Sequence, residues 1–168
     1  MCLPTTRPFI RLVLVASLSF AFAIIGCGSG RSKYQIISVP IRSVAWALQA
    51  SGKGSIFEFP VLRVYDSDGA LVYNGTNAPD NVRTIRSLPA GLFSLRPLVR
   101  GAHLKDLIAA VPELRVIGPW VSERGHPLIL SVELVNCGAC VEQQKTLSAY
   151  QNRLLREGFN VLVLDVTL

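Results

Sequence analysis

The stretch that decides the fold is residues 125–166, GHPLILSVELVNCGACVEQQKTLSAYQNRLLREGFNVLVLDV. Residues 127–135 are rich in branched apolar side chains, which is typical of a buried strand. Residues 141–158 have apolar positions at helical spacing and stop at a glycine, and residues 159–166 form a second apolar run. The sequence therefore predicts a strand, a helix and a second strand, with the two strands parallel in one sheet.

Two cysteines, Cys137 and Cys140, stand between the first predicted strand and the predicted helix. There the first cysteine meets the backbone N–H groups of the helix start, which stabilise a thiolate. A CxxC motif in this setting is typical of redox chemistry rather than metal binding. A structural zinc site needs four ligands, and His103 and His126 are not at paired-ligand spacing. We therefore expect no metal site and no other cofactor.

The first 26 residues have the pattern of a secretory signal peptide. Arg7 and Arg11 precede an apolar run over residues 12–25, which is shorter than the roughly 20 residues of a membrane-spanning helix. We expect a signal peptide over 1–26, a flexible tether over 27–33 and one domain over 34–168.

The end of the apolar run, Ile24-Ile25-Gly26-Cys27, resembles the lipobox of bacterial lipoproteins. That resemblance implies cleavage before Cys27, a diacylglyceryl thioether on its sulfur and acylation of the new amino terminus. Several acyl chains would anchor the protein firmly in a membrane. We expect a cell-envelope protein that faces the periplasm. An aspartate directly after the lipobox cysteine would resemble the signal that retains lipoproteins in the inner membrane, and this chain has Gly28 there. We therefore expect the outer membrane if the source is Gram-negative. The alternative is an ordinary signal peptide with a chance cysteine.

Net charge and cysteine content limit which partners and which disulfides are expected. The chain has a formal charge of +6, and removal of residues 1–26 leaves 15 basic and 11 acidic residues. The basic residues are dispersed and lack an aromatic stripe, so no nucleic-acid partner is expected. Cys2 leaves with the signal peptide and Cys27 would be lipidated, so Cys137 and Cys140 make the one disulfide open to the mature chain.

Residues 125–166 resemble the thioredoxin superfamily, and most closely the bacterial envelope thiol-disulfide oxidoreductases related to cytochrome-maturation thioredoxins. By that resemblance Cys137 is the attacking cysteine and Cys140 the resolving one, and the partner is a protein dithiol or disulfide. Two positions depart from the family pattern. Asn136 stands where an aromatic residue usually precedes the first cysteine, and Ser131 stands where thioredoxin has a buried acid that helps proton transfer.

A thioredoxin fold also needs a loop with a cis-proline beside the cysteines, a β-hairpin and a last helix. Residues 57–75 look like that part placed upstream, with Pro60, strand-like runs over 61–65 and 70–73, and a turn glycine, Gly69. We therefore expect an α/β, thioredoxin-like sheet with flanking helices, rearranged so that a hairpin half precedes a CxxC half over 125–168. Pro60 would then lie beside Cys137 as a third catalytic residue, with a cis bond. The alternative is a plain hairpin ahead of the core.

The remaining elements are predicted from weaker patterns. A strand is expected over residues 34–39, and helices are expected over 41–50, 77–87 and 104–111.

Three functions remain open at this stage. The first is a lipid-anchored thiol-disulfide oxidoreductase that uses Cys137 and Cys140. The second is a non-catalytic thioredoxin-like lipoprotein that acts as a binding or assembly module and keeps the disulfide for structure. The third is metal handling by the two thiolates.

Overall fold

The computed structural model describes residues 32–44, 58–88, 90, 103–115 and 125–168. The predicted signal peptide, Cys27 and most of the predicted tether lie outside these residues. Among the helices that are described, none combines the length and the apolar character needed to cross a membrane.

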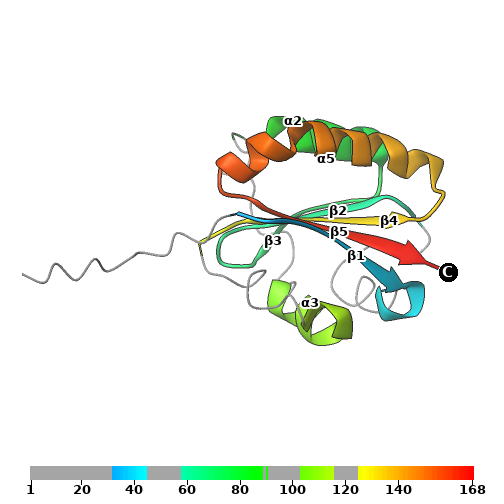
Figure 1. The fold of residues 1–168 in the computed structure, drawn as a ribbon. Coiled ribbons are helices and arrows are strands. Elements are labelled where there is room, and N and C mark those ends of the chain that lie inside the picture. The colour runs from blue at the N-terminus through cyan, green and yellow to red at the C-terminus, as the bar shows by residue number, and fades with distance from the viewer. Residues whose placement is uncertain (1–31, 45–57, 89, 91–102, 116–124) are drawn as a thin grey trace, which may run out of the picture.

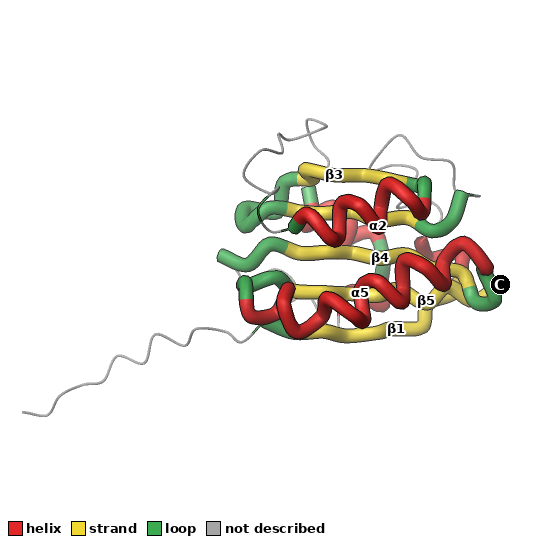
Figure 2. The backbone as a smooth tube through the Cα atoms, turned by 90° about the horizontal axis from the view of Figure 1, so that it is seen from above, coloured by secondary structure: helices red, strands yellow, loops and turns green. Residues whose placement is uncertain are grey.

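The described strands form one five-stranded mixed sheet in the order β1-β5-β4-β2-β3. Strands β1 (Tyr34–Pro40), β5 (Asn160–Thr167) and β4 (Leu128–Leu134) run parallel to one another. Strand β2 (Val61–Tyr65) pairs antiparallel with β4 on one side and with β3 (Leu71–Gly75) on the other. Figure 2 shows this order, with β3 and β1 at the two edges. The described chain is mixed α/β, as the sequence predicts.

The strand–helix–strand unit that decides the fold is present. Strand β4 is buried at its first six positions, because its apolar side chains are covered on both faces. Helix α5 (Gly138–Arg156) follows, and buries Leu147 and Leu154 against the sheet. Strand β5 then returns parallel to β4, with Leu128 opposite Asn160.

The predicted hairpin is also present, and it extends the sheet beyond β4. Gly69 has a φ of 83° in the turn between β2 and β3, a backbone conformation that glycine adopts without steric cost. All five residues of β2 are buried, and Val61 lies opposite Val132 of β4. A segment early in the chain therefore lies directly beside the strand that carries the cysteines.

Helices cover both faces of the sheet, as Figure 1 shows. Helices α2 (Ala78–Ser87) and α5 lie side by side on one face, while α3 (Leu104–Ala110) and a 3-10 turn (Pro112–Arg115) lie on the other. The strand predicted over 34–39 and the helices predicted over 77–87 and 104–111 are confirmed. Of the helix predicted over 41–50, residues 41–44 are described and helical. Each face has its own buried apolar cluster.

Truncation of a core isoleucine tests this architecture. Ile129 of β4 is fully buried under α2 and α5, whereas Ile36 of β1 is 54% exposed. We expect Ile129→Ala to lower the free energy of unfolding by about 2–5 kcal/mol, because it removes buried apolar contacts and leaves a cavity. Ile36→Ala should change it by at most about 0.5 kcal/mol. Urea denaturation of both variants measures the difference, and equal losses would contradict the burial described for β4.

Candidate functional site

The cysteine pair lies at the start of α5. Cys137 is the N-cap residue of this helix and forms a disulfide with Cys140, with the two Cα atoms 5.2 Å apart. The backbone N–H of Cys140 points at the Cys137 sulfur at 3.1 Å. Cys137 is partly exposed, whereas Cys140 is only 4% exposed. Once the bond is reduced, the helix start therefore favours a thiolate at Cys137, the sulfur that a partner can reach.

Asn136 occupies a backbone conformation that suits its residue type. Its φ of 65° places it in the left-handed region, where asparagine is tolerated far better than bulky or β-branched residues. The Cys137 N–H donates to the Leu134 carbonyl at 3.1 Å and closes the turn. Asn136 therefore lets the chain reverse between the end of β4 and the start of α5.

A cavity of about 300 Å³ lies beside the disulfide. It is bounded by the end of β4, the start of α5 and β5, and its described lining is Glu133, Leu134, Val135, Asn136, Cys137, Cys140, Val141, Gln144 and Asp165. Glu133 and Asp165 lie opposite each other on the paired strands β4 and β5. The cavity thus brings both sulfurs together with two carboxyl groups.

Glu133 is an unusual residue in this position because its side chain is an acid with almost no access to solvent. The residue is 2% exposed, and the Ser131 hydroxyl donates to its Oε1 atom at 2.6 Å. Burial raises the pKa of Glu133 above the ordinary value of 4.5, and the charge of Asp165 raises it further, while the Ser131 hydrogen bond opposes both. The site therefore holds a carboxyl group with raised proton affinity.

Two buried amide side chains, Gln143 and Asn81, are linked to this carboxyl group through the Ser131 hydroxyl. Gln143 is fully buried in α5, one turn after Cys140. Its Nε2 atom donates to the Ser131 hydroxyl at 2.7 Å and to the Val61 carbonyl at 3.3 Å. Its Oε1 atom accepts from Asn81 Nδ2 at 2.7 Å. Strand β4, strand β2, helix α5 and helix α2 are therefore joined by one polar chain.

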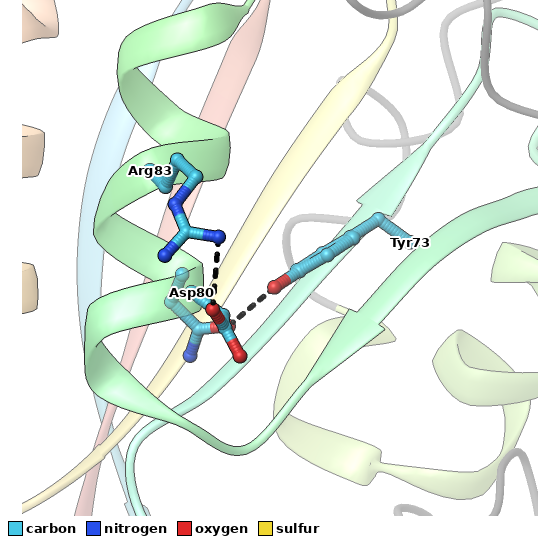
Figure 3. A network of polar contacts seen from close by, with 4 residues as sticks. Tyr73, Asp80 and Arg83 are labelled. Carbon is cyan, nitrogen blue, oxygen red and sulfur yellow. Dashed lines mark hydrogen bonds and ion pairs between the residues drawn. The ribbon is translucent and has the colours of Figure 1, made fainter.

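Asn81 of α2 extends this series of hydrogen bonds to the β2–β3 hairpin. Its Nδ2 atom lies 3.3 Å from the carbonyl oxygens of Pro60 and Gly75, and its Oδ1 accepts from the Tyr73 hydroxyl at 2.9 Å. Figure 3 shows Tyr73 pointing from the hairpin toward α2, where Asp80 and Arg83 form an exposed ion pair. A Cβ atom at Gly75 would collide with the Asn81 and Tyr73 side chains. Glycine is therefore required where the hairpin passes this helix.

Pro60 stands at the same end of the sheet as the cysteines. Its peptide bond to Phe59 is cis and the residue is buried. It precedes Val61, which pairs with Val132, so continuing the register by one position places it opposite Glu133. Pro60 is not among the described residues that line the cysteine cavity, and is linked to α5 through Asn81.

The sequence-predicted site residues thus divide into three groups. Cys137 and Cys140 are brought together in one disulfide, Pro60 lies at their end of the sheet, and Cys27 falls outside the described residues. The residues that the sequence did not single out are Glu133, Gln143 and Asn81. The available signal was weak: in the apolar run of β4, only Ser131 and Glu133 are polar, two positions apart and hence on one face.

The two histidines have local roles. His103 is the N-cap of α3, and His126 Nδ1 lies 2.8 Å from the Gly158 carbonyl. Across the residues that the structure describes, no three His, Cys, Asp or Glu side chains are grouped to hold a metal ion.

Comparison of the chain with protein-family models, with curated proteins and with solved structures gives no match.

The raised pKa of Glu133 predicts a pH-dependent stability. The folded state binds the Glu133 proton more tightly than the unfolded state does. The stabilisation that this proton gives to the folded state is therefore present below pH 4.5 and is lost as pH rises through the raised pKa. Glu133→Gln keeps an oxygen for the Ser131 hydroxyl and carries no charge. We expect the variant to melt at a higher temperature than the wild type at neutral pH, and the difference to disappear below pH 4.5.

The matched control is Glu142→Gln, at an exposed position of α5. It should leave the melting temperature unchanged across the same pH range. Thermal melts followed by circular dichroism measure both variants. A Glu133→Gln protein less stable than the wild type at neutral pH would contradict the raised pKa.

Proposed function

We propose that this protein is a lipid-anchored thiol-disulfide oxidoreductase of the cell envelope, with Cys137 and Cys140 as its reactive pair. The observation that carries the proposal is the unequal setting of the two sulfurs at the start of α5. Cys137 is partly exposed and faces a backbone N–H, while Cys140 is buried behind it. An exchange reaction needs this division between an attacking and a resolving sulfur.

The reaction proceeds in two exchanges. The Cys137 thiolate attacks one sulfur of a substrate disulfide, the substrate S–S bond breaks, and the second substrate sulfur leaves as a thiolate. Cys140 then attacks the Cys137 sulfur, the mixed disulfide breaks, and the substrate is released as a dithiol. Electrons pass from the cysteine pair to the substrate, and a protein dithiol partner returns the pair to its reduced form. The reverse sequence oxidises a substrate dithiol.

The sheet order supports a rearranged thioredoxin-like domain. The family needs a proline loop, a hairpin and a helix beside the CxxC unit. Here Pro60, the β2–β3 hairpin and α2 occur in that order, β2 pairs with β4, and α2 packs beside α5. On this proposal, the element order along the chain differs from that of the family, while the spatial arrangement of the elements is similar.

The surface around the disulfide suits a polypeptide partner. Val135 and Val141, on either side of the cysteine pair, are 44% and 43% exposed. Exposed apolar side chains beside a reactive group are suited to contact with a second protein. The proposed substrate is therefore a protein disulfide or dithiol presented on an accessible segment.

The membrane part of the proposal is based on the lipobox-like residues Ile24 to Cys27. A lipid anchor at Cys27, followed by the polar residues GSGRSK, would hold the domain close to the membrane surface. It would also place Cys137 and Cys140 in a compartment where disulfides form and persist.

Thiol trapping tests the exchange function. Cys140→Ser removes the resolving sulfur, so a substrate attacked by Cys137 should remain attached as a mixed disulfide. We expect partner-linked species that disappear on reduction, visible on non-reducing gels of membranes from cells that make the variant. The matched control, Cys137→Ser with Cys140→Ser, should trap nothing. If Cys140→Ser also traps nothing and the wild-type disulfide resists mild reductant, the protein is instead a module with a structural disulfide.

Cell fractionation tests the lipid anchor. Cys27→Ala removes the sulfur that would carry the diacylglyceryl group, so the protein should move from the membrane to the soluble fraction. Cys2→Ala changes the other cysteine of the amino-terminal region and should leave the protein in the membrane. Retention of Cys27→Ala in the membrane would overturn the lipoprotein assignment.

A further inference from the structure

We propose that the lipid anchor and the fold together hold the domain upright on the membrane, with Cys137 and Cys140 at the end that faces away from the lipid. The exchange partner is then a protein whose reactive cysteines lie well above the lipid headgroups. The proposal rests on the proposed function, because it assumes the anchor at Cys27 and exchange at the cysteine pair. It concerns where the exchange takes place and is independent of its direction.

The chain enters the domain at the end of the sheet opposite the disulfide. Strands β1, β5 and β4 are parallel, and Tyr34 at the start of β1 lies level with Val161 of β5 and Ile129 of β4. Cys137 follows the far end of β4. Figure 1 shows β1 beginning at one end of the sheet and the C-terminus of the chain at the other. We call the first the entry end and the second the cysteine end.

Two backbone contacts of Lys33 fix the entry point. Its N–H donates to the Asn160 side chain at 3.0 Å, and its carbonyl oxygen accepts from the Val161 N–H at 2.8 Å. Both partners lie at the start of β5. Only residues 28–32 therefore separate the proposed lipidated Cys27 from a residue that is bound to the entry end.

This short link limits which end of the domain approaches the lipid. From Cys27 to Lys33 there are six residue steps, and a Gly- and Ser-rich chain of that length has a root-mean-square length of roughly 13 Å. The sheet extends about 17 Å from the level of Ile129 to Leu134 at the end of β4, at about 3.3 Å per residue, and the turn to Cys137 adds to this. An inverted domain would need a tether extended along its whole side, whereas an upright domain would not.

Helix α5 sets the height of the disulfide above the lipid. It runs from Gly138, beside Cys137, to Arg156, which lies shortly before the start of β5 at the entry end. Its 19 residues extend about 28 Å at 1.5 Å per residue, so an upright domain holds Cys137 about that far above the last turn of the helix. Cysteines at the level of the headgroups are out of reach at this height. The partner's reactive cysteines therefore belong to a domain that extends above the membrane or is free of it.

Charge favours the same orientation on an anionic membrane. At the cysteine end, the cavity beside the disulfide has two carboxyl groups, Glu133 and Asp165, and no cation among its described lining residues. At the entry end, the start of β1, the hairpin turn and the end of α5 carry as many basic as acidic side chains. The basic ones are Lys33, Arg153 and Arg156, and the acidic ones are Asp66, Asp68 and Glu157. Anionic headgroups therefore repel the cysteine end and meet no net charge from these side chains at the entry end.

The exposed apolar side chains of the cysteine end are left to the partner in this orientation. Val135, Val141 and Leu168 are 44%, 43% and 94% exposed, and Val135 and Leu168 line one cavity with Asn136. A domain that placed these side chains in the lipid would be inverted. The two orientations put opposite ends of α5 next to the membrane, so they are distinguished by labels at those ends.

A quenching experiment on the lipidated protein, purified from membranes, compares the two ends. Cys137→Ser and Cys140→Ser remove the native thiols, and a fluorophore is attached at Glu142→Cys or at Glu157→Cys, both exposed positions. The protein is reconstituted into vesicles of phosphatidylethanolamine and phosphatidylglycerol with nitroxide-labelled headgroups. We expect at least about threefold stronger quenching of the label at position 157, because the two positions are about 22 Å apart along the helix. Equal quenching, stronger quenching at position 142, or a protein without lipid at Cys27 would overturn the proposal.

A longer tether is the matched control for the role of the short link. Insertion of a 20-residue Gly-Ser segment after Gly30 raises the root-mean-square length of the tether to roughly 28 Å, which is enough for the domain to invert. We expect the difference in quenching between the two labels to fall by at least about half. An unchanged difference would contradict the role that the proposal gives to the tether.

The trapped partner tests where exchange takes place. Mass spectrometry of the species linked to Cys140→Ser identifies the cysteine that Cys137 attacked, and we expect it in a segment outside the membrane. A linked cysteine within or next to a membrane-spanning segment would contradict this. The two proposals also fail separately. Unequal quenching without a trapped partner leaves the orientation and removes the oxidoreductase function, whereas a trapped partner with equal quenching leaves the function and removes the orientation.

Discussion

The pairing of β4 with a neighbour on each side is the constraint on which the rest of the structure depends. Strand β4 is parallel to β5 and antiparallel to β2, so its backbone groups are used on both edges. Its side chains are buried on both faces, so helices must cover the sheet above and below. The cysteine pair follows directly from the end of this strand. The cysteine pair therefore follows a strand that is paired on both edges and buried on both faces.

The elements that the sequence predicts best are those with a strong local pattern. The apolar runs of β4 and β5, the helical spacing of α5 and the glycine turn of the hairpin all depend on residues close together in the chain. The strand with which the hairpin pairs cannot be predicted from such local patterns. Strands β2 and β4 are far apart in sequence, and either edge of the sheet could accept the hairpin. Only the resemblance suggested that Pro60 and β2 lie beside the cysteine unit, and local pattern did not distinguish this from a plain hairpin.

The buried hydrogen bonds of the site could not be predicted from the sequence, for a physical reason. Asn81 and Gln143 are residue types found mostly at surfaces, and helical spacing alone groups Gln143 with the polar positions of α5. Here each amide is fully buried because the other satisfies it, and because Ser131 and backbone carbonyls complete the set. Such mutual satisfaction is a property of three-dimensional arrangement. The same holds for Glu133, whose proton affinity depends on what surrounds it.

The disulfide encloses a very short loop, since its two cysteines are three residues apart. Closing so small a loop removes little conformational freedom from the unfolded chain. The domain is held instead by two apolar cores and the buried amide chain, none of which includes the sulfur–sulfur bond. Opening and closing that bond therefore leaves the architecture in place. In the proposed exchange reaction, the electron pair would therefore be gained or lost at one end of the sheet, outside the contacts that hold the fold together.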